Sequence, residues 1–363
     1  MLRHAMDRVL VVGSGLTGAV TAALCRQNLP STPEICIWDK SQGAGGRMST
    51  SRCPSDNKCT VDLGAQYITL SKEYTVKRTG YGRLLNLVEN GVLSPMQGKM
   101  EGDNSAEGSQ HFVTPKGVSS LVKYYLSLSG NLAKLFIKIQ DVVKVSTNTG
   151  ESEDFDAVIL TLPVPQLLQL QGDINKTIEN SGDIKQNLEQ VTYSSRFALG
   201  LFYDKGTKLN YDWCAKYFPD HECIRYVSID TKKRGIDNED TAPSVVVHTN
   251  VVPFGLKYLE TDKDEVGPIV LKHLQTLLPE LPEPKHVKNH KWRYSQVIYQ
   301  SMKFRGNEMG LNVLLLLLYR IPTAKGSFTC TSMCTQNLPS ERLDSCPCQA
   351  LRQKLKKFQG SYQ

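Results

Sequence analysis

Three glycines and one carboxylate have the types and spacing that could bind a dinucleotide. Gly13, Gly15 and Gly18 form the pattern Gly-x-Gly-x-x-Gly, and Asp39 follows 21 residues after Gly18. In such a pattern the first glycine allows a tight turn, the second lets backbone N–H groups approach a pyrophosphate, and the third lets a helix pack closely against a strand. An acidic residue about twenty positions further on can accept hydrogen bonds from a ribose. The spacing therefore predicts binding of a nucleotide with a diphosphate.

The elements that must position these residues are predicted by the sequence around them. Val9–Val12 is a continuous aliphatic run, typical of a strand buried on both faces of a parallel sheet. Residues 19–26 favour a helix, and residues 35–38 form a second apolar run that ends at Asp39. A glycine turn with only a steric role is the alternative. Strand, glycines, helix, strand and acid occur in the right order, so we favour the dinucleotide site.

Two further stretches could contact a flat cofactor. Gly43–Arg47 is a glycine-rich loop, and the guanidinium of Arg47 is a planar donor suited to phosphate, although surface exposure is the ordinary explanation of a single arginine. Val61–Tyr67 runs from a strand into a glycine turn and offers the amide of Gln66 and the ring of Tyr67. These two side chains could line a planar ring.

Taken in order, these motifs resemble those of FAD-dependent enzymes of the amine-oxidase superfamily, and within it they are most similar to the renalase family. The resemblance covers residues 6 to about 297, and divergence begins after that. It rests on residues 38–40, 45–48, 62–69, 161–165, 170–173, 193–203, 228–230 and 252–255.

The resemblance implies an α/β fold: a Rossmann-like FAD-binding domain of the p-hydroxybenzoate hydroxylase and amine-oxidase type, with a second α+β domain built on an antiparallel sheet. We expect the FAD-binding domain at residues 6–75 and 110–168, and the substrate domain at 76–109 and 169–290. Residues 291–363 are expected to be a divergent tail. Within these ranges the sequence favours helices near 81–89, 119–128 and 265–278, and strands near 134–139, 142–146, 157–160, 197–203 and 245–252.

The resemblance also implies a cofactor and a reaction. FAD would be held noncovalently, because no cysteine of the tail lies in the glycine-rich motif that attaches flavin in amine oxidases. The family oxidises 1,2- and 1,6-dihydro isomers of NAD(P)H to NAD(P)⁺ and passes the electrons to molecular oxygen, which gives hydrogen peroxide. Catalytic residues are not assigned. The expected cofactor-binding residues are Gly13, Gly15, Thr17, Gly18, Asp39, Lys40, Gly46, Arg47, Gln66 and Tyr67.

Two other functions remain open at this point. A monoamine oxidase would share the flavin domain and would need an aromatic cage for a neutral amine. A secreted, non-catalytic ligand of a cell-surface receptor is a role also associated with the renalase family. The resemblance favours secretion over a cytoplasmic location. Residues 10–25 are apolar enough to resemble the core of a secretory signal, but cleavage would remove the phosphate loop, so we expect none.

Charge and composition exclude several classes of partner. Hydrophobic residues make up 40% of the chain and charged residues 22%, as in globular proteins. The net charge is +7, but residues 301–363 hold nine Lys/Arg and three Asp/Glu, so the remaining 300 residues carry only +1. We therefore expect no nucleic-acid partner. The apolar run at 313–318 is far shorter than the roughly 20 residues of a membrane span, and a core helix, a strand or an aggregation-prone segment are its alternatives.

The cysteines and histidines suggest no metal site or nucleophile. The ten cysteines are scattered, and neither Cys330/Cys334 nor Cys346/Cys348 has the spacing of a common zinc site. Cys53 and Cys59 flank a short loop and could pair. No histidine stands in a pattern with serine or cysteine typical of hydrolases, and His248 lies in a strand-like run where a satisfied sheet residue is the favoured interpretation.

The tail departs from the family in one decisive respect. Members close the flavin domain with a final strand and a Gly-Gly-Asp-Gly-Phe-type turn, whose backbone N–H groups serve the flavin. No such turn occurs in residues 298–363. From this the sequence predicts an open sheet edge, weak FAD binding, little oxidase activity and a tendency to aggregate through the leucine-rich run.

Overall fold

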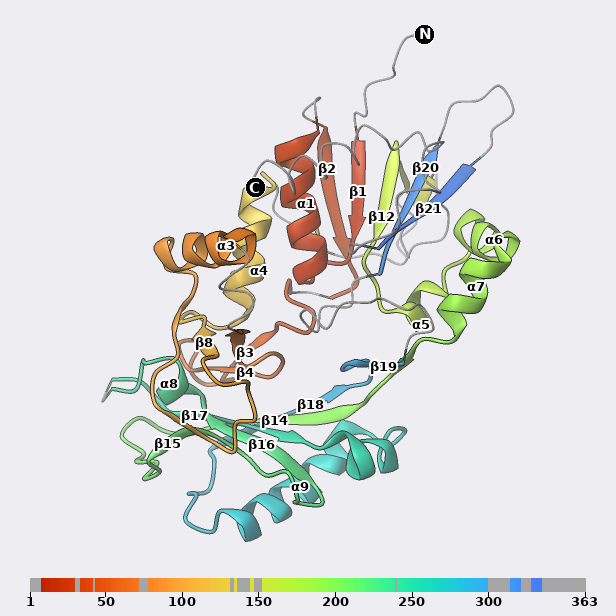
Figure 1. Ribbon diagram of the computed structural model, residues 1–363. Coiled ribbons are helices and arrows are strands. Elements are labelled where there is room, and N and C mark those ends of the chain that lie inside the picture. The colour runs from red at the N-terminus through yellow and green to blue at the C-terminus, as the bar shows by residue number, and fades with distance from the viewer. Residues whose placement is uncertain are drawn as a thin grey trace. The chain divides into compact units, whose positions relative to one another are not determined.

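A computed structural model describes two compact units of the chain (Figure 1). Unit 1 comprises Met1–Gly46, Val122–Thr192 and Val297–Gln363, and unit 2 comprises Arg47–Leu121 and Tyr193–Gln296. The domain boundaries expected at 75, 109, 168 and 290 stay a prediction. The structure describes residues 8–29, 33–41, 43–71, 78–130, 134–135, 144–146, 152–238, 240–299, 314–320 and 328–334.

Unit 1 is built on a six-stranded sheet with the order β21-β20-β12-β1-β2-β9. The central strand β1 is parallel to β12 on one side and to β2 on the other, with Val9 opposite both Ala157 and Ile35. Every side chain from Val9 to Val12 is buried, as its unbroken aliphatic run predicts. The strands are β1 (Arg8–Val12), β2 (Glu34–Asp39), β9 (Lys134–Leu135), β12 (Ala157–Leu160), β20 (Leu314–Arg320) and β21 (Phe328–Cys334).

The prediction of an open sheet edge beside β12 is wrong. β20, which is the leucine-rich run of the tail, pairs antiparallel with β12, with Tyr319 opposite Ala157. β21 then pairs antiparallel with β20. A run of apolar residues can supply a ladder strand without the motif of the family, because backbone groups make the pairing. The tail therefore covers the edge by a different sequence.

Helix α1 (Leu16–Asn28) contacts β1 and β2, along which Figure 1 shows it lying. Its buried face consists of Gly18, Ala19, Ala22 and Ala23, and such small residues let a helix approach a sheet closely. Unit 1 further contains β10 (Lys144–Ser146) paired with β11 (Ser152–Asp154), and the helices α5 (Val164–Leu167), α6 (Asp173–Asn180) and α7 (Gly182–Glu189). The predicted strand at 134–139 is observed at 134–135, and residues 136–139 lie outside the described part.

Unit 2 is built on a second six-stranded sheet with the order β18-β14-β17-β16-β15-β7. Its pairs are antiparallel except for β15 with β7. The strand expected to reach Val252 ends at Thr249, and the chain continues as the π-helical turn η1 (Val251–Gly255). The sheet strands are β7 (Lys99–Glu101), β14 (Arg196–Phe202), β15 (Trp213–Tyr217), β16 (Ile224–Ile229), β17 (Ser244–Thr249) and β18 (His286–Trp292).

Smaller elements complete unit 2. The hairpin of β3 (Thr50–Arg52) and β4 (Thr60–Asp62) comes before the large sheet in sequence, and a separate three-stranded sheet has the order β5-β8-β6. The chain passes between the units within α4 (Ser119–Leu128) and near β13 (Thr192–Tyr193) and β19 (Val297–Tyr299). The remaining elements are β5 (Ile68–Leu70), α3 (Arg78–Glu89), β6 (Ser94–Pro95), β8 (Gln110–Val113), α8 (Asp230–Lys233) and α9 (Lys263–Leu277).

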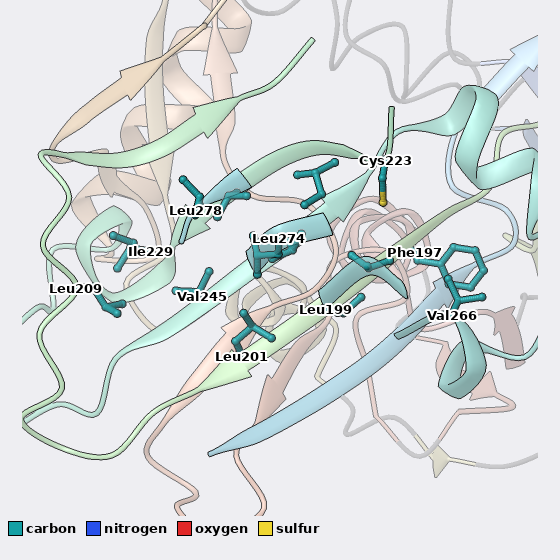
Figure 2. Close-up of a cluster of buried hydrophobic side chains, with 14 of the residues drawn as sticks. Phe197, Leu199, Leu201, Leu209, Cys223, Ile229, Val245, Val266, Leu274 and Leu278 are labelled. Atoms are coloured by element: carbon teal, nitrogen blue, oxygen red, sulfur yellow. The ribbon is translucent and has the colours of Figure 1, made fainter. Parts of the chain in front are cut away.

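The large sheet of unit 2 is buried on both faces at β14. Phe197, Leu199 and Leu201 point to one face, where they pack with Val266 and other residues of α9 (Figure 2). The alternate residues point to the other face, where Phe202 packs in a cluster with Val61 of β4. Alternation with period two explains the division. The β4 segment and the turn that follows it are thus held against a rigid sheet.

Candidate functional site

The glycine turn between β1 and α1 is a close-packed backbone cradle. Gly13 has φ of +107°, which favours glycine, and its N–H donates to the carbonyl of Trp38 at 2.7 Å. A Cβ on Gly18 would lie 1.8 Å from the carbonyl oxygen of Gly13. Thr161, just after β12, donates its hydroxyl to the carbonyl of Val12 at 2.7 Å. Neither outer glycine can carry a side chain without moving this backbone.

The middle glycine differs from its neighbours because its surroundings are open. A Cβ on Gly15 would find no described atom nearer than 3.9 Å, the carbonyl oxygen of Gly45. Gly15 also forms an isolated parallel bridge with Gly45, and the N–H of Gly45 donates to the carbonyl of Ser14 at 3.0 Å. The helix α1 begins directly after Gly15. The open space therefore lies at a helix N-terminus, where backbone N–H groups favour an anion.

Asp39 stands at the end of β2 and is held by the glycine turn. The backbone N–H and the hydroxyl of Ser14 donate to Oδ2 of Asp39 at 2.6 and 2.7 Å. The N–H of Ser41 donates to Oδ1 at 2.8 Å. Each carboxylate oxygen can accept more than one hydrogen bond, so Asp39 can still accept hydrogen bonds from ribose hydroxyls. The acid and the glycines are thus brought together as the spacing predicts.

The other predicted residues of unit 1 surround this turn less tightly. Thr17 is half-buried in the first turn of α1, and Lys40 is exposed after β2. Gly46 has φ of +55°, and a Cβ on it would lie 3.3 Å from Cα of Gly15. Sequence reasoning missed Ser14 and Thr161, because neither position is prescribed by the glycine pattern.

In unit 2 the structure joins two stretches that are 17 residues apart in sequence. The carbonyl of Arg47 accepts from the N–H of Ala65 at 3.0 Å, and a Cβ on Gly64 would lie 2.0 Å from this same oxygen. The side chain of Arg47 is exposed and donates from Nη1 to the carbonyl of Ser295 at 3.2 Å. Arg47 therefore shares one backbone platform with the turn at Gly64–Tyr67.

The side-chain amide of Gln66 is used within unit 2. Its Nε2 donates to the carbonyls of Asp62 and Gly64 at 2.5 and 2.9 Å. Its Oε1 accepts from Nζ of Lys233 at 2.8 Å and from the hydroxyl of Ser228 at 3.3 Å. Both amide hydrogens are engaged, so this side chain braces the turn. A direct contact from Gln66 to a cofactor would come most readily from its backbone.

Behind Gln66 lies a buried group of four charged side chains. Lys233 contacts Oδ1 of Asp230 at 2.5 Å, and Nη2 of Arg234 bonds Oδ2 of Asp230 and lies 3.2 Å from Oδ1 of Asp62. Burial and the charge of Asp230 raise the pKa of Asp62. Burial alone raises the pKa of Asp230, but Arg234 and Lys233 outweigh it and hold the pKa below its ordinary value. Asp62 and Asp230 lie in two of the motifs that carry the family resemblance, but the sequence did not predict that these carboxylates meet Lys233 and Arg234.

Tyr67 lies among other aromatic rings. Its hydroxyl is hydrogen-bonded to that of Tyr217, and its ring forms a T-shaped pair with the ring of His111, with the centroids 5.0 Å apart. Burial, followed by the bond to Tyr217, raises the pKa of Tyr67, so the phenol stays neutral. Nε2 of His111 also lies 2.9 Å from the carboxylate of Asp103.

The carbonyl of Leu63 is a second fixed point beside the turn. Nε2 of His248 donates to it at 3.0 Å, and the indole N–H of Trp292 donates at 2.9 Å. Burial, followed by the charge of Arg196, lowers the pKa of His248 to about 3. His248 is therefore a neutral, satisfied residue of β17, as its strand-like sequence indicates.

Comparison with known proteins identifies the family. An NAD(P)-binding Rossmann-like domain matches residues 11–80, and the flavin-containing amine oxidoreductase family matches residues 104–312. Mouse renalase is 44% identical over 314 residues, which cover 85% of this chain and 90% of the mouse protein. The chain belongs to the renalase family. It is therefore a flavin oxidoreductase by family.

Solved structures agree with the fold. The chain resembles reduced UDP-galactopyranose mutase with a TM-score of 0.53 and 12% identity over 80% of this chain and 82% of the other. It resembles putrescine oxidase bound to putrescine with a TM-score of 0.53 and 11% identity over 78% and 84% of the two chains. At such identities the likeness concerns the fold alone. Together with the family matches it confirms the Rossmann-like domain joined to a second domain with an antiparallel sheet.

The described cysteines and helices bear on the possible disulfide and on a membrane span. Cys25, Cys36, Cys53 and Cys59 carry free thiols, so the disulfide that the sequence allows between Cys53 and Cys59 is not formed. The Sγ of Cys59 instead donates to the carbonyl of Ala242 at 3.4 Å. Within the described residues no helix is long and apolar enough to cross a membrane. The cysteines at 346 and 348 lie outside the described part.

Proposed function

We propose that this member of the renalase family binds FAD noncovalently and oxidises the 1,2- and 1,6-dihydro isomers of NAD(P)H to NAD(P)⁺. One substrate molecule gives up a hydride, and one molecule of oxygen with one proton becomes hydrogen peroxide. The observation that supports the cofactor is the open space at Gly15, at the start of α1 and beside the fixed carboxylate of Asp39. The substrate is proposed from the membership of the family.

The residues of unit 1 fit the adenosine diphosphate part of FAD. Backbone N–H groups around Gly13, Gly15, Thr17 and Gly18 would bind the pyrophosphate, and Asp39 would accept the ribose hydroxyls. Gly46 is proposed to leave room for the phosphates, and the exposed Lys40 is proposed to add a positive charge beside them. In unit 2, the guanidinium of Arg47 and the Gln66–Tyr67 segment are proposed to contact the cofactor.

The protein residues have a modest chemical task in this reaction. FAD, when bound, would supply the hydride-accepting and oxygen-reducing chemistry, so the residues of this chain would mainly position and desolvate the reactants. Tyr67 stays a neutral phenol and His248 a neutral imidazole, because burial disfavours their charged forms. Neutral polar and aromatic side chains are better suited than charged side chains to contact a planar, uncharged dihydronicotinamide ring.

Rapid mixing under anaerobic conditions tests the proposal. Purified protein loaded with FAD is mixed either with 1,2-dihydro-NAD or with a monoamine such as benzylamine. We expect bleaching of the flavin absorption with the first and none with the second, and peroxide on admission of air. Reduction by the amine alone would make the chain an amine oxidase. Acid precipitation should release all flavin from the polypeptide, and retained flavin would overturn noncovalent binding.

A further inference from the structure

Lys233 is a fully buried cation at the end of the short helix α8. Its side chain is 0% exposed, and it lies next to Arg234, which is itself buried. We propose that Lys233 is a positioning residue that fixes the Gly64–Tyr67 turn through the amide of Gln66. The inference rests on the proposed function, because it assigns to Lys233 the ordering of three residues proposed to contact FAD.

Hydrogen-bond chemistry decides the orientation of the amide. An ammonium has three donors and no acceptor, so the side chain that faces Lys233 must present an oxygen. Oε1 of Gln66 accepts from Nζ at 2.8 Å, and the amide nitrogen must then point the other way. There it donates to the carbonyls of Asp62 and Gly64. Without the ammonium group of Lys233, the preference of the Gln66 amide for this orientation over the flipped one would be weaker.

The constraint passes along the backbone to Arg47. Gly64 is packed so closely against the carbonyl of Arg47 that a Cβ would lie 2.0 Å from it, and the N–H of Ala65 donates to the same oxygen. A shift at Gly64 therefore shifts Arg47 as well. Lys233 in this way orders Arg47, Gln66 and Tyr67 without needing to contact a ligand itself.

Stability alone is a weak explanation for a buried ionic group. Desolvation of charges opposes their mutual attraction, and apolar residues of similar volume often replace such groups without loss of stability. Here the carboxylates of Asp62 and Asp230 each do a second task. Oδ1 of Asp62 accepts from the N–H of Val118 at 2.9 Å, and Oδ2 of Asp230 accepts from the N–H of Asp62 at 3.2 Å. The group thus ties α8, β4 and the start of α4 to one point behind the turn.

The neighbouring Lys232 provides a matched control. It belongs to the same helix and is half-buried, but its Nζ donates to the carbonyls of Leu209 and Tyr211 at 3.0 and 2.8 Å. Lys233→Met and Lys232→Met each remove one charge from α8. Only the first removes the charged donor to Gln66.

Hydrogen exchange of the flavin-free protein measures how well the backbone of the Gly64–Tyr67 turn is ordered. Mass spectrometry of the peptide that covers residues 62–69 should show at least tenfold faster exchange in Lys233→Met than in wild type, with little change in Lys232→Met. Lys233→Gln retains an N–H donor and should restore part of the protection. It is also the variant to use if the methionine variant fails to fold. Equal exchange in all these proteins would overturn the positioning role.

A flavin titration of the same proteins tests the link to the cofactor. Lys233→Met should weaken FAD binding about tenfold or more and shift the visible absorption of bound flavin, whereas Lys232→Met should change neither. In a Gln66→Met background the effect of Lys233→Met should fall to less than twofold, because the residue acts through Gln66. Loosened exchange with unchanged affinity and spectrum would overturn the link to FAD. Wild type that binds no FAD would instead overturn the proposed function, while the exchange result still decides whether Lys233 positions the turn.

Discussion

Arg47 and Lys40 are two exposed cations proposed to contact the cofactor, and we expect them to contribute very differently to the free energy of FAD binding. Arg47 presents a planar fork whose backbone is fixed against Gly64. A bidentate, charge-assisted contact from such a fork to phosphate is worth on the order of 2–3 kcal/mol, whereas a lysine that stays solvated contributes under about 1 kcal/mol. We expect Arg47→Ala to weaken FAD binding by about 30-fold or more, and Lys40→Ala by a factor of five at most. Equal dissociation constants in a flavin titration would refute the assignment of Arg47.

His248 makes the stability of unit 2 depend on pH. The pKa of its imidazole is about 3 in the folded chain and about 6.5 in an unfolded chain, so only the unfolded state takes up a proton between these values. The contribution is fully present above pH 6.5 and is lost as the pH falls towards 3. The free energy of unfolding should decrease by about 1.4 kcal/mol per pH unit from this group.

A variant isolates the contribution of His248 from other titrations. His248→Gln keeps an N–H donor for the carbonyl of Leu63 and does not titrate. Urea unfolding followed by tryptophan fluorescence between pH 7.5 and pH 4.5 should give a shallower dependence for the variant. Parallel curves for the two proteins would show that His248 is charged in the folded state or that its burial is incomplete.

At the scale of elements, the β1–α1 turn separates two roles of glycine. Ala at position 18 would place Cβ 1.8 Å from the carbonyl of Gly13, so Gly18→Ala should destabilise unit 1 by several kcal/mol and abolish flavin binding. Ala at position 15 would meet nothing nearer than 3.9 Å, and φ of −77° suits alanine. Gly15→Ala should therefore fold normally and still lose FAD affinity by tenfold or more, because its methyl group fills the proposed phosphate space.

Thermal unfolding and flavin titration of the two variants provide the measurement. If the Gly15→Ala protein bound FAD as tightly as wild type, the proposal that the phosphates bind at this turn would be wrong. A Gly18→Ala protein of normal stability would contradict the close helix–strand packing.

The same elements show how far sequence alone could go. β1, α1, β2, α4 and β12 were predictable because their sequences are locally unambiguous: continuous aliphatic runs, glycines in fixed order and clear breakers. The pairing of β20 with β12 was not predictable, since a leucine-rich run fits a helix or a strand and its partner is distant in sequence. The early end of β17 at Thr249 is also a tertiary effect, because Asn250 accepts the N–H of Phe254 and turns the chain.

The candidate site divides in the same way. Spacing was sufficient for the glycines and Asp39, which the structure brings together through Ser14. It was insufficient for Gln66, whose amide is bonded to residues of its own unit, and for Lys233, which stands 167 residues away from it. Contacts between distant segments leave no periodic trace in one sequence, so a buried charge of this kind resembles a surface lysine until the fold is known.

At the scale of the whole molecule, the tail distinguishes this chain from what its family predicts. β20 covers the edge of β12, so an open sheet edge is no longer a reason to expect low activity. The Gly-Gly-Asp-Gly-Phe-type turn is nevertheless absent from residues 298–363, and with it the N–H groups that would serve the flavin. We therefore still expect weak FAD binding and low oxidase activity, now from the missing turn rather than from an open edge.

A chimera tests this expectation. Residues 298–363 are replaced by the C-terminal segment of mouse renalase, and both proteins are purified without added flavin and then titrated with FAD. The chimera should bind FAD at least tenfold more tightly and release more peroxide with 1,2-dihydro-NAD. The control is the free energy of unfolding of both proteins without FAD. If the chimera is also more stable without FAD by as much as its FAD binding is tighter, the difference arises from folding and not from contacts with the flavin. Equal flavin affinity and turnover in the two proteins would show that this tail supplies its own donors to the cofactor, which would make the turn of the family dispensable.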